Sequence, residues 1–208
     1  MKHITLFFDL EGFWEAPYKG SFDEEQNVRN IINVLNKYNA KAVFNTCGVI
    51  GEFWPEIIKQ IAKDGHEIAS HGHKHENFLQ LKKEELNKIL EKTEKIIYAL
   101  TNQRIIGLRC PWLLHNEMVY EVAKERGYKW VSNKYFPFPE LFSNPGSKTY
   151  GVYKLAKLSL KFQHLFFKKE PYNVDGLLEI PLTSSLENDL LGLMNCWQES
   201  PKDWLDYA

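Results

Sequence analysis

The sequence predicts an α/β fold in the form of a distorted or incomplete (β/α) barrel. Strand-like and helix-like stretches alternate several times along the chain, which indicates parallel strands joined by helical crossovers. Reactive side chains follow several different strands, as in barrels that assemble a site from many strand ends at one rim. An open doubly wound sheet, the alternative, gathers its site at one switch point. Fewer than eight strands are predicted, so the barrel is incomplete.

The predicted strands are short apolar runs. The first, ITLFF, has the length of a strand and is followed at once by Asp9, so it is neither a signal peptide nor a membrane span. The predicted strands are residues 4–8, 41–45, 66–70, 105–109, 128–132 and 176–182.

The predicted helices show apolar residues at helical spacing, such as Val28, Ile32 and Leu35 on one face. Residues 55–65 begin with Pro and end with Gly, as helices tend to do. The predicted helices are residues 23–39, 55–65, 83–100 and 117–127, and a further helix is expected to begin at residue 201.

Residues 133–175 interrupt the alternation and are interpreted as an irregular insertion in a single domain of residues 1–208. Within it, residues 147–169 contain no Asp or Glu and are rich in Lys and aromatic side chains. We expect this segment to be a helix with solvated lysines. The alternative is a surface that faces an anionic glycan or a lipid-linked substrate.

The composition excludes several classes of protein. The net charge of −1 gives no indication of binding to nucleic acid, and no stretch is apolar and long enough for a membrane span. Three widely spaced cysteines do not form a disulfide framework and favour a reducing compartment. We therefore expect a cytoplasmic protein, with its oligomeric state left open.

Three histidines lie within five residues, in the stretch IASHGHKHENF. In an extended strand His71, His73 and His75 would face one side. If the chain instead turns at Gly72 into a helix or a helix-like loop, His71 and His75 lie one turn apart and can share a metal ion. The second arrangement is favoured, because the strand at 66–70 ends just before, and it leaves His73 exposed and pointing elsewhere.

Two imidazoles need a third ligand, and carboxylates follow the first strand. Asp9 and Glu11 lie two residues apart, so that one can bind an ion while the other acts as a general base. Arg109 lies at the end of the fourth strand, where a guanidinium can orient a nearby carboxylate and lower its pKa.

These motifs resemble those of NodB-like polysaccharide deacetylases, carbohydrate esterase family 4. Asp-x-Glu after the first strand, Ser-His-Gly-x-x-His after the third and Arg-x-Pro-aromatic after the fourth occur in the family's order. Residues 42–48 (AVFNTCG) and 177–181 (LLEIP) are similar to the family's second strand and to a late strand. The resemblance therefore spans most of the chain.

The resemblance implies a site and a reaction. It implies Asp9 as the catalytic base, Arg109 as the residue that holds this base, and Trp112 as the residue whose backbone N–H points to the developing oxyanion. It also implies a divalent metal, zinc first, with cobalt, nickel or iron as alternatives. The implied metal ligands are Glu11, His71 and His75.

The expected activity is hydrolysis of an acetyl or similar acyl group from an N-acylated sugar or polysaccharide. The chain departs from the family where a carboxylate is usual, since it has Val131, Ser132 and Asn133 there. It also has no histidine after His164 to protonate the leaving amine, so the last strand is missing or the acid is absent or replaced. The alternatives are therefore a catalytically weak or silent carbohydrate-binding protein, a small-molecule amide hydrolase, and a fragment completed by another chain.

Overall fold

The computed structural model describes residues 5–11, 24–134 and 170–182. The chain divides into two compact units, one made of Met1–Lys134 with Pro171–Ile180 and the other of Tyr135–Glu170 with Pro181–Ala208. The described residues belong almost wholly to the first unit. The predicted helices at 147–169 and from residue 201 lie outside the described residues, and the single-domain organisation stays a prediction.

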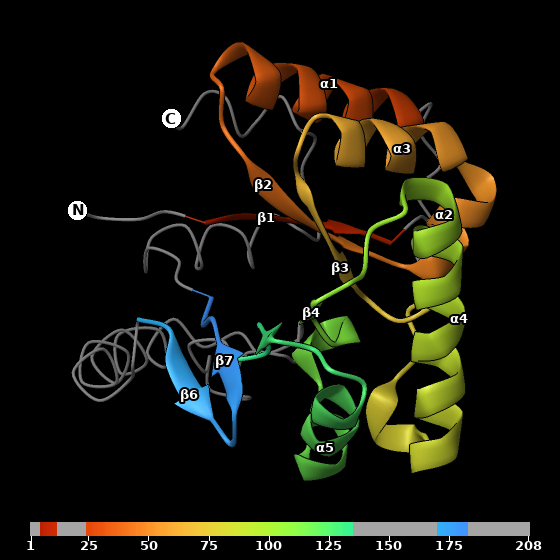
Figure 1. The fold of residues 1–208 in the computed structure, drawn as a ribbon, viewed down its shortest axis with the longest axis vertical. Helices are drawn as coiled ribbons and strands as arrows, with labels where there is room; N and C mark the ends of the chain where they lie inside the picture. Colours follow the sequence, from red (N-terminus) through yellow and green to blue (C-terminus); the bar gives the residue numbers. More distant parts are fainter. Residues whose placement is uncertain (1–4, 12–23, 135–169, 183–208) are drawn as a thin grey trace, which may run out of the picture. The chain divides into compact units, whose positions relative to one another are not determined.

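Strands and helices alternate in the first unit as the sequence predicts (Figure 1). The strands are β1 (Leu6–Leu10), β2 (Ala42–Thr46), β3 (Glu67–Ser70), β4 (Gly107–Leu108), β5 (Trp130–Val131), β6 (Tyr172–Val174) and β7 (Leu177–Glu179). The helices are α1 (Glu24–Lys37), α2 (Gly48–Phe53), α3 (Pro55–Lys63), α4 (Lys83–Thr101) and α5 (Glu117–Glu125), with 3-10 turns η1 (Phe78–Gln80) and η2 (Pro111–Leu113).

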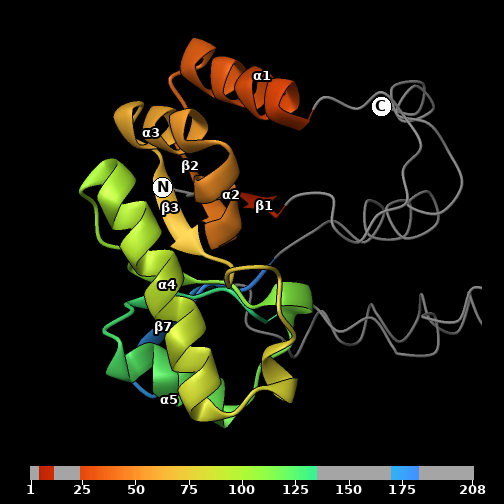
Figure 2. The same ribbon diagram turned by 90° about the vertical axis from the view of Figure 1, so that its right-hand side faces the viewer.

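The strands form one seven-stranded sheet in the order β1-β2-β3-β4-β5-β7-β6. All neighbours are parallel except β6 and β7, which are antiparallel. The order from β1 to β5 advances without a reversal, so this part of the sheet has no switch point of the doubly wound type. Right-handed crossovers that advance in one direction place their helices on one face. Figure 1 shows α1 and α3 above the strands, α4 to their right and α5 below, and Figure 2 shows α4 in front.

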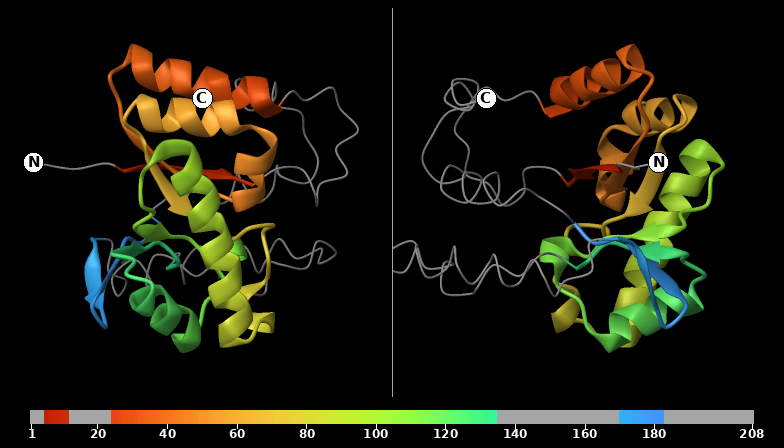
Figure 3. Two further views of the ribbon diagram at one scale, coloured as in Figure 1. Left: turned by 45° about the vertical axis from the view of Figure 1, so that its right-hand side comes forward. Right: turned by 90° about the vertical axis from the view of Figure 1, so that its left-hand side faces the viewer.

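The barrel is incomplete, which confirms the predicted fold class. Among the described residues, β1 and β6 are the two edges of the sheet and do not pair with each other. Figure 3 shows β6 and β7, in blue, at the end of the sheet away from β1. The hairpin strand β6 was not predicted, and it falls within residues 133–175, which were expected to be an irregular insertion.

The core lies between the sheet and the helices. Ile57, Ile58 and Ile61 of α3 are fully buried among residues of β1, β2 and β3. Leu86 and Leu90 of α4 pack with α5, β4, β5 and β7 in a second cluster. Among the described residues no helix combines the length and the hydrophobicity that a membrane span requires. The burial of these apolar faces fixes the strands, and with them the positions of the residues that follow each strand.

Helix α2 was not predicted, because its sequence, GVIGEF, has two glycines and no side-chain cap. Its first amides are held from outside instead: Gly48 donates to the Gly72 carbonyl and Val49 to the His73 carbonyl, both at 3.0 Å. A Cβ at Gly48 would also overlap the Thr93 side chain of α4. Tertiary contacts therefore form this helix, not helix propensity.

Gly107 in β4 offers a test of the packing across the sheet. A Cβ at this position would overlap the Trp130 indole, whose Nε1 donates to Glu67 Oε1 at 2.7 Å. We expect Gly107→Ala to lower the free energy of unfolding by about 1–3 kcal/mol, through overpacking. In a Trp130→Leu background the same change should cost about 1 kcal/mol less, because the clash is gone.

Chemical denaturation of the four proteins in this double-mutant cycle measures the coupling. Gly127→Ala is the control, since nothing lies within 4 Å of a Cβ there. Its effect should be the same in both backgrounds. Additive effects of Gly107→Ala and Trp130→Leu would contradict the packing described.

Candidate metal centre

The residues singled out in the sequence meet at the carboxyl edge of the sheet (the rim). Asp9 lies opposite Asn45 in the parallel register of β1 and β2, and Ser70 lies opposite both Thr46 and Leu108. Because neighbouring parallel strands stop at the same level, the residues that follow them share one edge. Glu11 follows β1, His71 follows β3 and Arg109 follows β4.

Glu11, His71 and His75 form a group that can hold a metal ion. Nε2 of His71 lies 3.1 Å from Oε2 of Glu11, and Nε2 of His75 lies 2.9 Å from the same oxygen. The three ligand atoms all lie within 4.8 Å of one another. Both histidines are buried, while the Glu11 side chain is 41% exposed. The hydrogen bonds from His71 and His75 lower the pKa of Glu11 to about 2.

The hydrogen bonds of His71 fit a metal site. Its Nδ1 lies 2.8 Å from the Arg109 carbonyl oxygen, which can only accept, so this nitrogen carries a proton. Nε2 is then the nitrogen directed at Glu11, and a metal ion between the two groups would take its lone pair. Tetrahedral zinc places its nitrogen and oxygen ligands about 3.3 Å apart, close to the distances from Glu11. The residues present therefore fit a divalent ion.

His71 and His75 meet through a loop and not through a helical turn. The residues between them form no helix, and Gly72 and His75 have positive φ values of 77° and 58°. The ring centroids of His71 and His75 lie 5.0 Å apart, and those of His75 and Trp112 lie 4.3 Å apart with the rings edge to face. A left-handed backbone at a histidine is uncommon, so the pairing depends on contacts around the loop.

His73 points away from this group, as predicted, but the prediction that it is exposed is wrong. It is only 5% exposed, and its Nε2 lies 2.6 Å from Nζ of Lys92 on α4. Burial lowers its pKa, and Lys92 adds to the effect. The carbonyl of His73 holds the start of α2, so this histidine packs the loop against two helices.

Asp9 is held by Arg109 beside the metal-binding group. Nη1 of Arg109 donates to Oδ1 of Asp9 at 2.9 Å, and Nδ2 of Asn45 donates to the same oxygen at 2.6 Å. No described residue donates to Oδ2, which leaves that oxygen available to a proton. Arg109 is 3% exposed; burial lowers the pKa of its guanidinium, and Asp9 opposes the shift.

Sequence reasoning missed Asn45 and Ser132. Asn45 is fully buried and follows three apolar residues of β2, and a polar residue directly after this apolar run was the local signal that could have drawn attention to it. Ser132 accepts from Nη2 of Arg109 at 2.9 Å through its hydroxyl and from Nε at 3.3 Å through its carbonyl. Arg109 is thus oriented by three groups.

Trp112 lies in the turn that follows Arg109. Its φ is +51° and that of Leu113 is +60°, so two bulky residues have a left-handed backbone. The Trp112 side chain is 48% exposed. Within the described residues no acceptor takes its backbone N–H.

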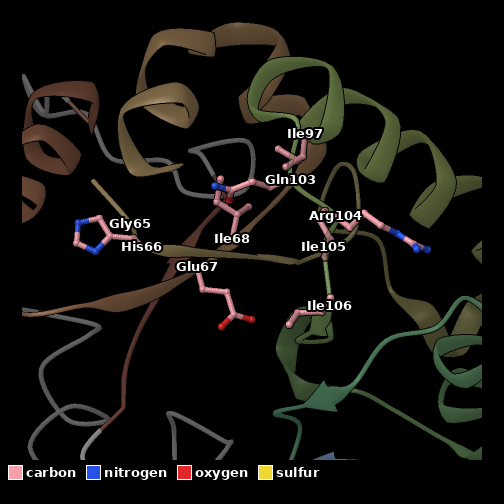
Figure 4. Close-up of a pocket in the computed structure, with 9 residues that line it drawn as sticks. All are labelled: Gly65, His66, Glu67, Ile68, Ile97, Gln103, Arg104, Ile105 and Ile106. Carbon is pink, nitrogen blue, oxygen red and sulfur yellow. The ribbon is translucent and has the colours of Figure 1, made fainter. Parts of the chain in front are cut away.

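The cavity shown in Figure 4 lies elsewhere. It has a volume of about 420 Å³ and is lined by residues that include Gly65, His66, Glu67 and Arg104. These residues lie at or just before the amino ends of β3 and β4, whereas His71 and Arg109 follow the carboxyl ends. This cavity is therefore at the edge of the sheet opposite the metal-binding group.

Solved structures with the same fold are known. A polysaccharide deacetylase structure from Mycobacterium smegmatis matches 86% of this chain and 58% of its own, with a TM-score of 0.64 and 20% identity. A CE4 family pseudoenzyme from Bacillus anthracis matches 91% of this chain and 60% of its own, with a TM-score of 0.54 and 16% identity. At these identities the similarity establishes the fold.

The sequence matches curated relatives over part of their length. A peptidoglycan deacetylase from Helicobacter pylori is 26% identical over 58% of this chain and 42% of its own length. Two peptidoglycan-N-acetylglucosamine deacetylases from Bacillus cereus are 30% and 28% identical, over 36% and 66% of their lengths. The match thus spans about a third to two thirds of these relatives. Residues 2–131, well over half of the chain, match the family model described as polysaccharide deacetylase, and the chain therefore belongs to the polysaccharide deacetylase family.

Proposed function

We propose that this chain is a metal-dependent hydrolase that removes an acetyl group from an N-acetylated sugar of a glycan, with peptidoglycan as the first substrate to test. One observation carries the proposal: two imidazole nitrogens face one oxygen of Glu11, and a second carboxylate, Asp9, is held by Arg109 at the same rim. Relatives that carry the name peptidoglycan deacetylase support the choice of substrate.

Glu11, His71 and His75 are the proposed ligands of the metal. A bound divalent cation supplies Lewis acidity here, which polarises an acyl carbonyl and makes water more acidic. Zinc suits a site with two imidazoles and one carboxylate, and cobalt, nickel or iron also accept this ligand set.

Asp9 is the proposed general base, and its surroundings fit that role. Oδ1 is occupied by Arg109 and Asn45, so the carboxylate is oriented with Oδ2 directed to accept a proton from the attacking water. The backbone N–H of Trp112 is the proposed donor to the negative charge that develops on the acyl oxygen. The exposed Trp112 ring beside His75 offers a surface on which a sugar can pack.

A catalytically silent, glycan-binding protein is the second candidate. Its support is that solved structures of similar fold include a protein described as a CE4 family pseudoenzyme. Loss of a general acid lowers the rate by about 10²–10⁴ without affecting binding. Acetate release by the metal-loaded protein separates the two candidates.

The proposed ligands make a first prediction. We expect the purified chain to bind about one zinc ion per molecule, because three ligands already converge. Glu11→Ala and His71→Ala should each lose that ion, since two ligands and water hold zinc far more weakly.

Elemental analysis after reconstitution and removal of excess metal gives the measurement. His73→Gln is the matched control: it changes a histidine of the same loop whose ring contacts Lys92, and it should keep the ion. Retention of zinc by both Glu11→Ala and His71→Ala would overturn the proposed site.

The proposed base makes a second prediction. Asp9→Asn should lower kcat for acetate release by about 10²–10⁴, because an amide cannot take the proton. The variant should keep its zinc, since Asp9 is not a ligand. Acetate release from N-acetylglucosamine oligomers and from peptidoglycan measures the rates, with zinc content as the control for folding.

Two results would contradict this assignment. A rate for Asp9→Asn within threefold of the unchanged protein would remove Asp9 from the reaction. No acetate from the zinc-loaded, unchanged protein on either substrate, together with measurable binding to peptidoglycan, would favour the silent glycan-binding protein.

A further inference from the structure

Glu179 of β7 is a fully buried carboxylate that has no part in the mechanism proposed above. Its Oε1 accepts from the backbone N–H groups of Asn133 and Lys134, both at 2.8 Å. Its Oε2 accepts from the Tyr120 hydroxyl at 2.7 Å. A buried charge is costly unless it is well hydrogen-bonded, and here both oxygens have partners. The two backbone amides that it binds indicate what this buried carboxylate does in the fold.

Hydrogen bonds to the Glu179 carboxylate continue the pairing of β5 and β7 beyond the last backbone bond between the two strands. Ile180 donates to the Val131 carbonyl at 2.8 Å, and β5 ends at Val131. The amides of Asn133 and Lys134 lie beyond the strand, and Glu179 binds both of them. The Glu179 side chain thus fixes the backbone beyond β5 as far as Lys134.

Ser132 and Asn133, which follow β5, hold the turn that follows β4. Oδ1 of Asn133 accepts from the Cys110 N–H at 2.7 Å, and Asn133 is 1% exposed. Ser132 accepts two bonds from the Arg109 guanidinium, and its hydroxyl donates to the Ile180 carbonyl at 2.7 Å. One end of β5 is therefore fixed by β7 and in turn fixes Arg109 and Cys110.

This turn carries functional groups and strain. It leads from Arg109 to Trp112 and Leu113, whose positive φ values are unfavourable for bulky residues. Such backbone conformations persist only when the surroundings determine them. The bond from Cys110 to Asn133 lies at the start of the strained turn.

From this chain of bonds we infer that Glu179 and Asn133 are positioning residues for the proposed deacetylation: Glu179 orders the end of β5, and Asn133 fixes the turn that presents Arg109 and the Trp112 N–H. The inference rests on the proposed function for its effect on rate. Neither residue touches the metal-binding group in the described structure; both act through Cys110 and the turn. The carboxylate acts here as a geometric acceptor.

The test compares Asn133→Ala with Asn116→Ala. Each change removes an Asn Oδ1 that accepts a backbone N–H, from Cys110 at 2.7 Å and from Val119 at 3.0 Å respectively. Asn133→Ala should speed hydrogen exchange of the Cys110 amide about tenfold. It should lower kcat about 10- to 100-fold, because the turn that carries the Trp112 N–H and ring is misplaced. Asn116→Ala should change neither quantity, and both variants should bind zinc like the unchanged chain.

A second pair of variants tests Glu179 itself. Glu179→Gln keeps one oxygen for the two amides, and its NH₂ can donate to the Tyr120 hydroxyl, so kcat should stay within about threefold. Glu179→Ala removes the acceptor and should reproduce the effects of Asn133→Ala. Should Glu179→Ala fail to fold, Asn133→Ala still decides, since it removes only one side-chain bond.

The inference and the proposed function would be contradicted by different results. If Asn133→Ala matches Asn116→Ala in exchange and in kcat, the inference is wrong even though the chain is a deacetylase. If Glu179→Gln is as impaired as Glu179→Ala, positioning by geometry is overturned. If the unchanged chain releases no acetate, the proposed function fails, and hydrogen exchange at Cys110 alone shows whether Asn133 holds the turn.

Discussion

The described structure depends on one buried cation, the guanidinium of Arg109. It donates to Asp9 after the middle of β1 and to Ser132 beyond β5, and the Arg109 carbonyl accepts from His71 after β3. A buried charge that loses its partners costs about 3–5 kcal/mol. Arg109 can therefore be buried only when the ends of four strands are aligned. The same alignment creates the candidate site, so the fold and the site support each other.

Two carboxylates two residues apart acquire different surroundings from this arrangement. Asp9 faces the guanidinium and the Asn45 amide, while Glu11 faces two imidazoles. The imidazoles hold the pKa of Glu11 at about 2, so this carboxylate is ionised and ready to bind a cation. A division of labour between neighbouring carboxylates through their environments is a recurring solution in hydrolytic sites.

Much of the fold could be predicted because the apolar residues of a buried face recur in the sequence at the period of a helix or a strand. The helices over Pro55–Lys63 and Lys83–Thr101 lie within two residues of their predicted ends. Helix α2 could not be predicted, since the carbonyls of Gly72 and His73 hold it in place of its own side chains. The exposure of His73 was misjudged for a similar reason: only the packing of α4 against the loop decides it.

The sequence by itself determined which residues lie at or just after the end of each strand, and so it brought Asp9, Glu11, His71 and Arg109 to one rim. Strand periodicity and parallel order are enough for that, because parallel strands end at the same edge. Only the tertiary structure decided the backbone at His75 and Trp112, and the bonds from Glu179 to Asn133 and from Asn133 to Cys110. Those bonds join residues 46 and 23 positions apart. They arise from the register between strands, which no single stretch of sequence encodes.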